Sequence, residues 1–334
     1  MERRAVQMGL WMVAFAVLWK LAGGGGLRAM TETLKEPSVA AFLLYLETGR
    51  RVSAETAPTT EVTTEPAPTT APTTAPTETA APKQPLQFAK EDGLRVELFN
   101  ATSYGVDTQQ LVTKSISWDL TEGGPKVLIL HAHATECYTR AGEKYAESGE
   151  YRTLDEGYNL VRIGEAVAQV LESYGIQVIH DRTLHDHPSY NGSYTASRKT
   201  VEKYLQQYPD IALVLDLHRD AVELSNGRQM DTTAQVNGKE AAQLMLVMGS
   251  DAGGLHYPAW QENLTVATQL HACLEGSAPG LMRPLYFRKE RFNQDLLQGM
   301  LLVEVGAAGN TLAEALVAAE ALGHAIGAMR YGTN

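Results

Sequence analysis

From residue 126 onward, continuously apolar segments alternate with segments whose apolar residues recur at helical spacing. This alternation predicts strands and helices in turn, since a strand buried on both faces is apolar throughout. We expect strands at residues 126–130, 176–180, 211–216, 244–248 and 301–305. We expect helices at residues 160–171, 194–208 and 260–274, and a last helix that opens at Thr311 with a capping box to Glu314. The order predicts an α/β fold with a mainly parallel twisted sheet and helices on both faces.

The N-terminal segment has the pattern of a membrane anchor. Residues 5–21 form an apolar run, and a helix of that length nearly crosses a bilayer core of about 30 Å. Arg3 and Arg4 precede the run, and positive charges favour the cytoplasmic side. We therefore predict an N-terminal transmembrane anchor over residues 1–26, with the rest of the chain outside the cytoplasm. A cleaved signal peptide is the alternative interpretation.

Two segments separate this anchor from the folded part of the chain. Residues 27–51 contain a short apolar stretch, which predicts a membrane-proximal helix. Residues 52–85 consist mostly of Thr, Pro, Ala and Glu, and such a composition buries too little apolar surface to fold. We interpret these residues as a linker. Residues 86–334 have a globular composition and are expected to form one domain.

The charge balance and the cysteine count limit the classes of function. The net charge of −11, from 39 acidic and 28 basic residues, argues against nucleic-acid binding, which needs a cationic face. An uncharged or zwitterionic polymer is still compatible as a substrate. Cys137 and Cys273 are too few for a disulfide framework or a Cys-rich zinc site. The candidate chemistry therefore lies among the histidines and carboxylates.

Polar side chains come at the carboxyl ends of three predicted strands, where ligands bind in open α/β sheets. His131 and His133 follow the first strand, His218 follows residues 211–216, and Glu304 lies in the last strand. Two histidines and a carboxylate are the ligand set of a catalytic zinc site, which leaves one position open for water. Zinc lowers the pKa of that water, and a further carboxylate can carry its proton to a leaving amine. The sequence therefore predicts a Zn²⁺ site for hydrolysis; the competing interpretation is that these histidines only hydrogen-bond loop backbone.

The residues alone leave the identity of two ligands open. His131 and His133 point the same way in an extended segment. His133 lies further past the strand, which makes it the better candidate, with His131 as the alternative. Asp155, before the first helix, and Glu136, in the loop after His133, both qualify as the third ligand. A nucleophilic Cys137 paired with a histidine is a weaker alternative, because no separate base and orienting residue is evident for it.

Three further residues are candidates for holding substrate. Arg219 directly follows a candidate ligand and could bind a substrate carboxylate, although a surface ion pair accounts for it equally well. Glu262 and Asn293 lie in two polar segments that suit either binding or the start of a helix. Residues 180–187 are dense in His and Asp, which favours a substrate-lining loop over a second metal site.

Several ordered motifs match a known family. They are the segments at residues 42–49, 131–136, 159–164, 180–181, 190–194, 216–221, 260–264, 291–296 and 304–306. On these motifs the chain resembles the stage II sporulation protein P family of endospore-forming bacteria. That family is similar to the zinc-dependent N-acetylmuramoyl-L-alanine amidases. The resemblance implies an amidase-like catalytic domain over residues 86–334.

The resemblance also implies roles for individual residues. Those amidases use a His after the first strand, a Glu at the start of the next helix, a second His after a later strand, and a catalytic Glu in a Val-Glu-Val-Gly-like strand. Carried over, these positions fall on His133, on Asp155 or a neighbouring residue, on His218 and on Glu304, and the first three would bind Zn²⁺. The second position departs from the pattern, because Asp155 stands where the family has Glu.

The implied activity is hydrolysis of peptidoglycan at the amide between N-acetylmuramic acid and L-alanine, together with cleavage of peptide cross-links. The implied role is septal thinning and engulfment of the forespore during sporulation, from the mother-cell membrane at the septum. A SpoIID-like transglycosylase and a SpoIIM-like membrane protein are the implied partners. One alternative is a membrane-tethered scaffold of the engulfment complex with weak catalysis. Another is a zinc carboxypeptidase that acts on stem-peptide ends.

Overall fold

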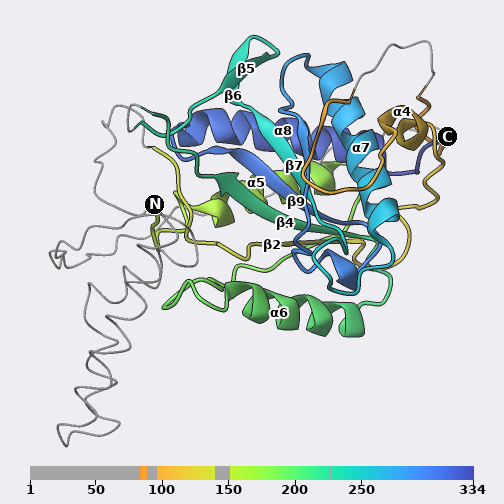
Figure 1. Cartoon of the computed structure of the whole chain (residues 1–334), viewed down its shortest axis with the longest axis horizontal. Coiled ribbons are helices and arrows are strands. Elements are labelled where there is room, and N and C mark those ends of the chain that lie inside the picture. Colours follow the sequence, from red (N-terminus) through yellow and green to blue (C-terminus); the bar gives the residue numbers. More distant parts are fainter. Residues whose placement is uncertain (1–82, 89–95, 140–150, 226–227) are drawn as a thin grey trace, which may run out of the picture. The chain divides into compact units, whose positions relative to one another are not determined.

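The computed structural model describes residues 83–88, 96–139, 151–225 and 228–334 (Figure 1). The expected anchor and membrane-proximal helix lie outside the described residues, as does nearly all of the expected linker. In the described part of the chain, no helix is both long enough and apolar enough to cross a membrane. The described residues all belong to one unit, Thr79–Asn334.

A seven-stranded sheet forms the centre of this unit (Figure 1). Its strands lie in the order β1-β8-β7-β9-β4-β2-β3. They are β1 (Leu98–Asn100), β2 (Val127–Leu130), β3 (Val178–His180), β4 (Leu213–Asp220), β7 (Leu244–Met248), β8 (Leu285–Phe287) and β9 (Met300–Ala307). A separate antiparallel hairpin of β5 (Thr233–Val236) and β6 (Lys239–Ala242) lies between β4 and β7 in the sequence.

The strand pairs of the seven-stranded sheet are parallel, apart from β7 with β9. The expected mainly parallel sheet is therefore confirmed, with one reversal of direction. The reversal brings the carboxyl ends of β2, β4 and β9 to one edge of the sheet and the carboxyl end of β7 to the opposite edge. All five predicted strands take part in the sheet, whereas the sequence pattern does not predict the short strands β1 and β8.

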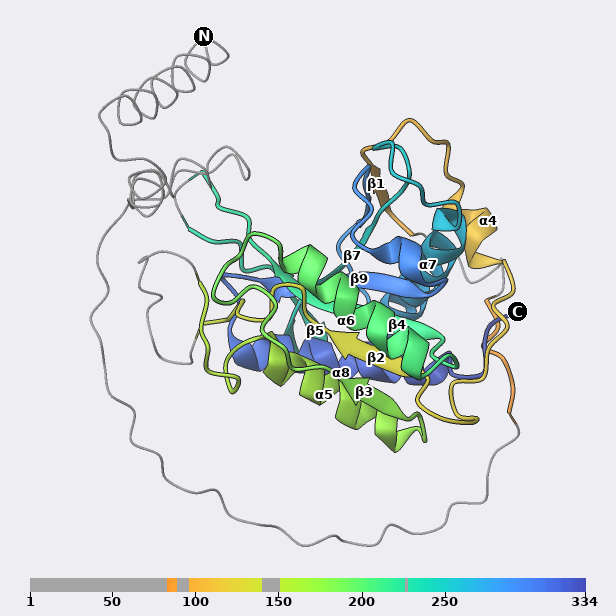
Figure 2. The same cartoon turned by 90° about the horizontal axis from the view of Figure 1, so that it is seen from below.

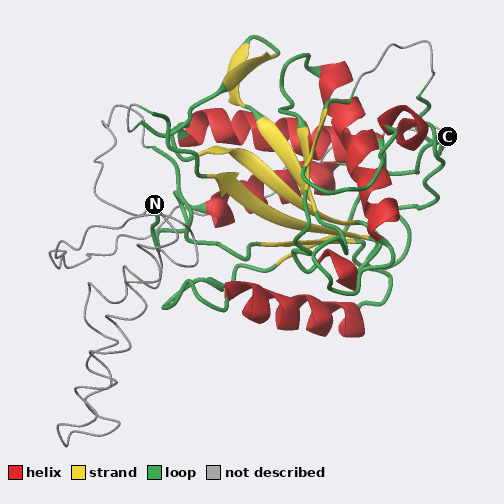
Figure 3. Cartoon of the chain, in the orientation of Figure 1, coloured by secondary structure: helices red, strands yellow, loops and turns green. Residues whose placement is uncertain are grey.

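Helices cover the two faces of the sheet unequally (Figures 1 and 2). They are α4 (Thr108–Val112), α5 (Leu160–Ser173), α6 (Ser193–Gln207), α7 (Trp260–Ser277) and α8 (Leu312–Ala328), with a 3-10 turn, η2 (Gln294–Leu296). The long helices α5, α7 and α8 lie together on one side of the strands, and α6 lies on the other side. Figure 3 shows the same arrangement, with helices in red on both sides of the yellow strands of the sheet.

The face that α5, α7 and α8 cover holds the main hydrophobic core. Alternate residues of the central strands point into it, such as Leu217 of β4 and Val303 of β9, both fully buried. Burying a side chain of this size contributes about 1.5–3 kcal/mol. The predicted capping box fixes the start of α8, since the Thr311 side chain accepts a hydrogen bond from Glu314 N and the Glu314 carboxylate accepts one from Thr311 N.

Helix α6 covers only part of the opposite face. Its apolar side chains pack over β2, β4 and the start of β9 in a cluster that contains Leu128, Leu130, Val201, Val214 and Met300. On the neighbouring strands a separate cluster of Met245, Val247 and Leu302 is covered by the rings of Tyr286 and Phe292. This second half of the α6 side, over β9, β7, β8 and β1, is here called the open face.

Candidate metal centre

A tight turn after β2 carries two of the candidate ligands. The backbone N–H of Glu136 donates to the carbonyl oxygen of His133 at 3.1 Å, so the chain folds back within one turn. The turn places the side chains of His133 and Glu136 side by side, with 3.6 Å between His133 Nδ1 and Glu136 Oε1. Both side chains are buried.

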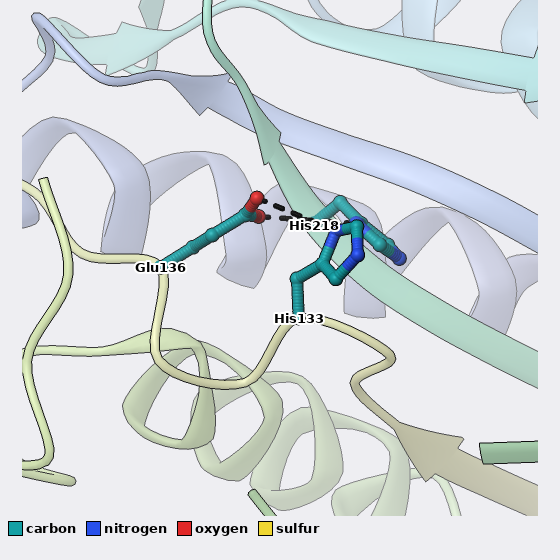
Figure 4. A group of neighbouring side chains, drawn as sticks. All are labelled: His133, Glu136 and His218. Carbon is teal, nitrogen blue, oxygen red and sulfur yellow. Dashed lines mark ion pairs between the residues drawn. The ribbon is translucent and has the colours of Figure 1, made fainter. Parts of the chain in front are cut away.

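Strand β4 brings the third side chain to this turn (Figure 4). His218 Nδ1 lies 3.8 Å from Glu136 Oε2, and the ligand atoms of His133, Glu136 and His218 all lie within 4.8 Å of one another. All three residues are buried. Two imidazoles and one carboxylate are a donor set of catalytic zinc sites, which leave a further position for water. The group can therefore hold a metal ion, and its chemistry fits Zn²⁺.

Asp216 fixes the orientation of the two histidine-bearing segments relative to each other. Its Oδ1 lies 3.1 Å from His218 Nε2 and accepts a hydrogen bond of 2.8 Å from the backbone N–H of Ala132. Asp216 is buried, and it shares a face of β4 with His218 because the two are two residues apart. A carboxylate on the far nitrogen of a ligating histidine sets its tautomer and ring orientation.

Several neighbours contact the Glu136 carboxylate and hold it in its charged form. Arg152 Nη2 lies 3.4 Å from Oε1, and the backbone N–H of Arg219 donates to Oε2 at 3.2 Å. Burial alone raises the pKa of Glu136, but the hydrogen bond from His133 and the charges of Arg219, His133 and His218 bring it well below its usual range. Glu136 is therefore an anionic donor at neutral pH.

The third acidic group of the site, Glu304, lies beside His218 on the neighbouring strand. The two residues are direct partners in the register of β4 and β9. Glu304 Oε2 is buried and has no hydrogen-bond partner among the described residues. Burial raises the pKa of Glu304 to about 8, against the opposing charge of His218, with added repulsion from Asp220 and Glu136. A carboxylate with such a pKa can accept a proton and give it up again near neutral pH.

The charges around His218 favour a cation at this position. Burial alone lowers the pKa of His218, but Asp216, Glu136 and Glu304 together raise it to about 9. Three carboxylates thus surround one imidazole. In a metal-bound site, the ion itself would supply the positive charge that these carboxylates attract.

Two aromatic rings pack against His133. Tyr190 stacks on the His133 ring with 4.5 Å between centroids, and Tyr194 meets it edge-on at 5.4 Å. The guanidinium of Arg152 lies over the Tyr190 ring, with its Cζ 4.7 Å from the ring centroid. These rings form one wall of the centre and continue toward α6.

The structure does not bring Asp155 to the two histidines. Asp155 is exposed, and its Oδ1 accepts a hydrogen bond from Gly157 N at 3.0 Å in the turn before α5. Glu136, which the sequence offers as an alternative, lies beside both histidines, whose rings contact each other edge-on with 4.9 Å between centroids. His131 points elsewhere, because its Nε2 lies 3.0 Å from His180 Nε2 and its Nδ1 lies 3.2 Å from the carbonyl oxygen of Leu217. Burial lowers the pKa of His131 to about 3, so it is a neutral, buried side chain.

The three candidates for substrate binding lie in different environments. Arg219 is buried, and its guanidinium donates to the carbonyl oxygens of Cys137 and Tyr151 at 3.0 Å and 2.6 Å, so it ties two loops together. Asn293 Nδ2 donates to the carbonyl oxygen of Tyr194 at 2.8 Å, close to the aromatic wall. Glu262 is exposed in the first turn of α7. That turn follows β7 and therefore lies at the opposite edge of the sheet.

Sequence reasoning missed Asp216 and Arg152 as parts of the site. Asp216 has a detectable signal, because an acidic residue two positions before a ligand histidine on a strand shares its face. Arg152 has none, since its approach to Glu136 depends on the isolated bridge between the two residues. Cys137, the alternative nucleophile, forms the next bridge, with Asn159.

Comparison with known proteins assigns the chain to a family. The family model described as "Stage II sporulation protein P" matches residues 49–327. The chain belongs to the stage II sporulation protein P family. A curated member, "Stage II sporulation protein P" of Bacillus subtilis (strain 168), is 30% identical over 215 residues, which cover 60% of this chain. The match spans 50% of that relative's length. Membership in the stage II sporulation protein P family implies a role in sporulation.

Proposed function

We propose that the chain is a zinc-dependent N-acetylmuramoyl-L-alanine amidase that hydrolyses peptidoglycan during sporulation. The observation that carries the proposal is the buried group of His133, Glu136 and His218, with the unpartnered carboxylate of Glu304 beside it. This combination provides both a metal site and a separate proton carrier. A scaffold protein would gain nothing from burying four ionisable groups together, because their desolvation costs free energy.

His133, Glu136 and His218 would hold the ion, and Asp216 would keep the His218 ring in place. Bound zinc would lower the pKa of an attacking water and polarise the amide carbonyl. Glu304 would take the proton from that water as it attacks the carbonyl carbon. Glu304 would then pass the proton to the amide nitrogen, so that the C–N bond breaks and the peptide leaves with a free amine.

The biological setting that we propose follows from the family. The chain would act outside the cytoplasm on the septal wall between mother cell and forespore, held by its N-terminal anchor in the mother-cell membrane. It would thin the septal peptidoglycan for engulfment, together with a SpoIID-like transglycosylase and a SpoIIM-like membrane protein. Cleavage of peptide cross-links would be a second activity of the same site.

The test of this proposal is replacement of His218 by alanine in the full chain, with the exposed His324→Ala as a matched control. We expect the unmodified chain and His324→Ala to contain one zinc per chain and to release stem peptides from purified sacculi. We expect His218→Ala to lose both properties while its far-UV circular dichroism is unchanged. Metal analysis and mass spectrometry of the released products provide the measurements.

Three outcomes would contradict the proposal. Full amidase activity in His218→Ala would exclude this metal centre. Zinc binding without any product from sacculi would favour the scaffold alternative. Release of single amino acids from stem-peptide ends, with the lactyl amide intact, would favour the carboxypeptidase alternative.

A further inference from the structure

The open face carries a line of side chains that runs straight across the strands from the metal centre. Phe99 of β1 is the register partner of Tyr286 of β8, and Tyr286 is the partner of Val247 of β7. Val247 is the partner of Leu302 of β9, which is itself the partner of Asp216. Register partners point to the same face of a sheet. Four steps of about 4.8 Å between strands therefore place Phe99 roughly 19 Å from Asp216, on the face that carries His218.

Aromatic rings make this line continuous in space. Phe99 and Tyr286 meet edge-on with 5.1 Å between centroids. The guanidinium of Arg288 lies 5.1 Å from the Tyr286 ring and 5.5 Å from the Phe292 ring, so it bridges the two. Phe292 lies 6.1 Å from Tyr194, which contacts the His133 ring. We call Tyr194, Phe292, Arg288, Tyr286 and Phe99 the aromatic row.

The backbone holds Phe292 in this row at some conformational cost. Phe292 and Asn293 have φ values of 50° and 60°, in the left-handed region that bulky side chains rarely adopt. The Asn293 side chain secures the segment by donating to the carbonyl oxygen of Tyr194. A strained conformation that the surrounding structure maintains is typical of binding and catalytic sites.

Three rings of the row, those of Tyr286, Phe292 and Phe99, are available to a ligand. Tyr286 and Phe292 cover the buried cluster of Met245, Val247 and Leu302, and both are partly exposed. Phe99, at the sheet edge, is 60% exposed. The row is narrow and made of flat rings, unlike the broad, well-packed patches with which proteins associate.

We propose that the aromatic row binds the sugar chain of the polymer whose amide is cut at the metal centre. This inference rests on the proposed function, because the scissile amide joins a sugar chain to a peptide and each must leave the centre in its own direction. Pyranose rings present apolar C–H faces that stack on aromatic rings, and Arg288 can donate to their hydroxyl and acetamido oxygens. The net charge of −11 disfavours an anionic polymer but not an uncharged glycan.

The test measures binding to peptide-free glycan strands, which contain no bond that the centre could cut. We expect the full chain to bind these strands, and the Phe99→Ala/Tyr286→Ala variant to bind them at least about tenfold more weakly, because two stacking contacts are lost. Tyr286→Phe should retain binding, since it keeps the ring. Tyr331→Ala is the matched control, because Tyr331 also lies under an arginine, with Arg330 Cζ 4.6 Å from its centroid, but outside the row. It should bind like the unmodified chain.

A second measurement separates recognition of the sugar chain from other roles. The loss of hydrolysis in Phe99→Ala, whose exposed ring can be removed without opening the core, should be larger on sacculi than on a single muropeptide. Zinc content and melting temperature should match those of the unmodified chain. Binding to glycan strands needs neither zinc nor hydrolysis. The result of the binding measurement is therefore independent of the His218→Ala test.

Four results would overturn the proposal. The first is that the unmodified chain fails to bind peptide-free glycan strands, and the second is that Phe99→Ala/Tyr286→Ala binds them as tightly as Tyr331→Ala does. The third is that the row variants lose affinity for free stem peptides instead of glycan, which would make the row a peptide site. The fourth is that the chain self-associates in solution and Phe99→Ala makes it monomeric, which would make the row an interface between copies.

Discussion

The two faces of the central sheet are built from the same strands but perform different tasks. On the face that α5, α7 and α8 cover, β4 and β9 contribute Leu217 and Val303, which are apolar and fully buried. On the other face, one residue further along each strand, they contribute His218 and Glu304. Because side chains of a strand alternate between faces, one sequence supplies a stable core and a reactive site at adjacent positions.

The comparison shows where stability and chemistry are located. The face that α5, α7 and α8 cover gains free energy from burial of apolar surface. The α6 face loses some of that gain, because it buries the mutually repelling carboxylates of Asp216, Glu136 and Glu304 around His218. Neighbouring substitutions on one strand should therefore have opposite consequences.

The largest effect is expected from Glu304→Gln, compared with its neighbour Val303→Ala. Loss of the proton carrier should reduce kcat on a muropeptide by about 10²–10⁴-fold. The free energy of unfolding should not fall, because Glu304 Oε2 is buried without a hydrogen-bond partner. Val303→Ala should do the reverse, with about 2 kcal/mol less stability in urea unfolding and nearly unchanged kcat. Equal losses of kcat in both variants would show that the faces are not separate.

A second contrast is between Leu217→Ala and His218→Ala, which change adjacent residues of β4 on opposite faces. Leu217 is fully buried in the main core, so its truncation should cost about 2–5 kcal/mol of unfolding free energy. Zinc content measured well below the melting temperature should stay at one per chain, since the side chain points away from the centre. Zinc loss in folded Leu217→Ala protein would mean that core packing positions His218 more tightly than the strand backbone does.

The smallest effect is expected from Asp216→Asn, which tests how the reactive face is held together. The amide oxygen can still accept the hydrogen bond from Ala132 N, but the negative charge beside His218 Nε2 is lost. Zinc affinity should fall by about 10–100-fold, as is typical when the partner of a ligating histidine is changed. Competition with a chelating dye measures it. Unchanged affinity would show that the histidine needs no such support.

Most of the sheet could be predicted because its strands are buried on both faces. Residues 126–130 and 301–305 are continuously apolar, and this pattern is independent of distant contacts. Strands β1 and β8, of three residues each, lie toward one edge of the sheet and have too short a pattern to detect. The reversal between β7 and β9 is also invisible, since an apolar run does not record its direction.

The parts of the candidate site that lie in a strand or directly after one could be predicted from the sequence, as His133 was after β2. His218 and Glu304 lie within β4 and β9, so sequence position places them at one edge. The approach of Glu136 to His133 depends instead on a tight turn, in which the backbone N–H of Glu136 donates to the carbonyl oxygen of His133. The family pattern directs attention to Asp155, which stands in an exposed turn. Local backbone geometry, rather than residue type, decides between the two carboxylates.

The reversal of β7 has a consequence for how this fold can vary among related chains. The segment at residues 249–259 leaves the sheet at the edge opposite to His133 and His218, and it leads into α7. Insertions there would lengthen the molecule away from its reactive edge. We therefore expect evolutionary change in length, such as an added recognition loop, to accumulate in this segment, while the turn at residues 131–136 keeps a constant number of residues.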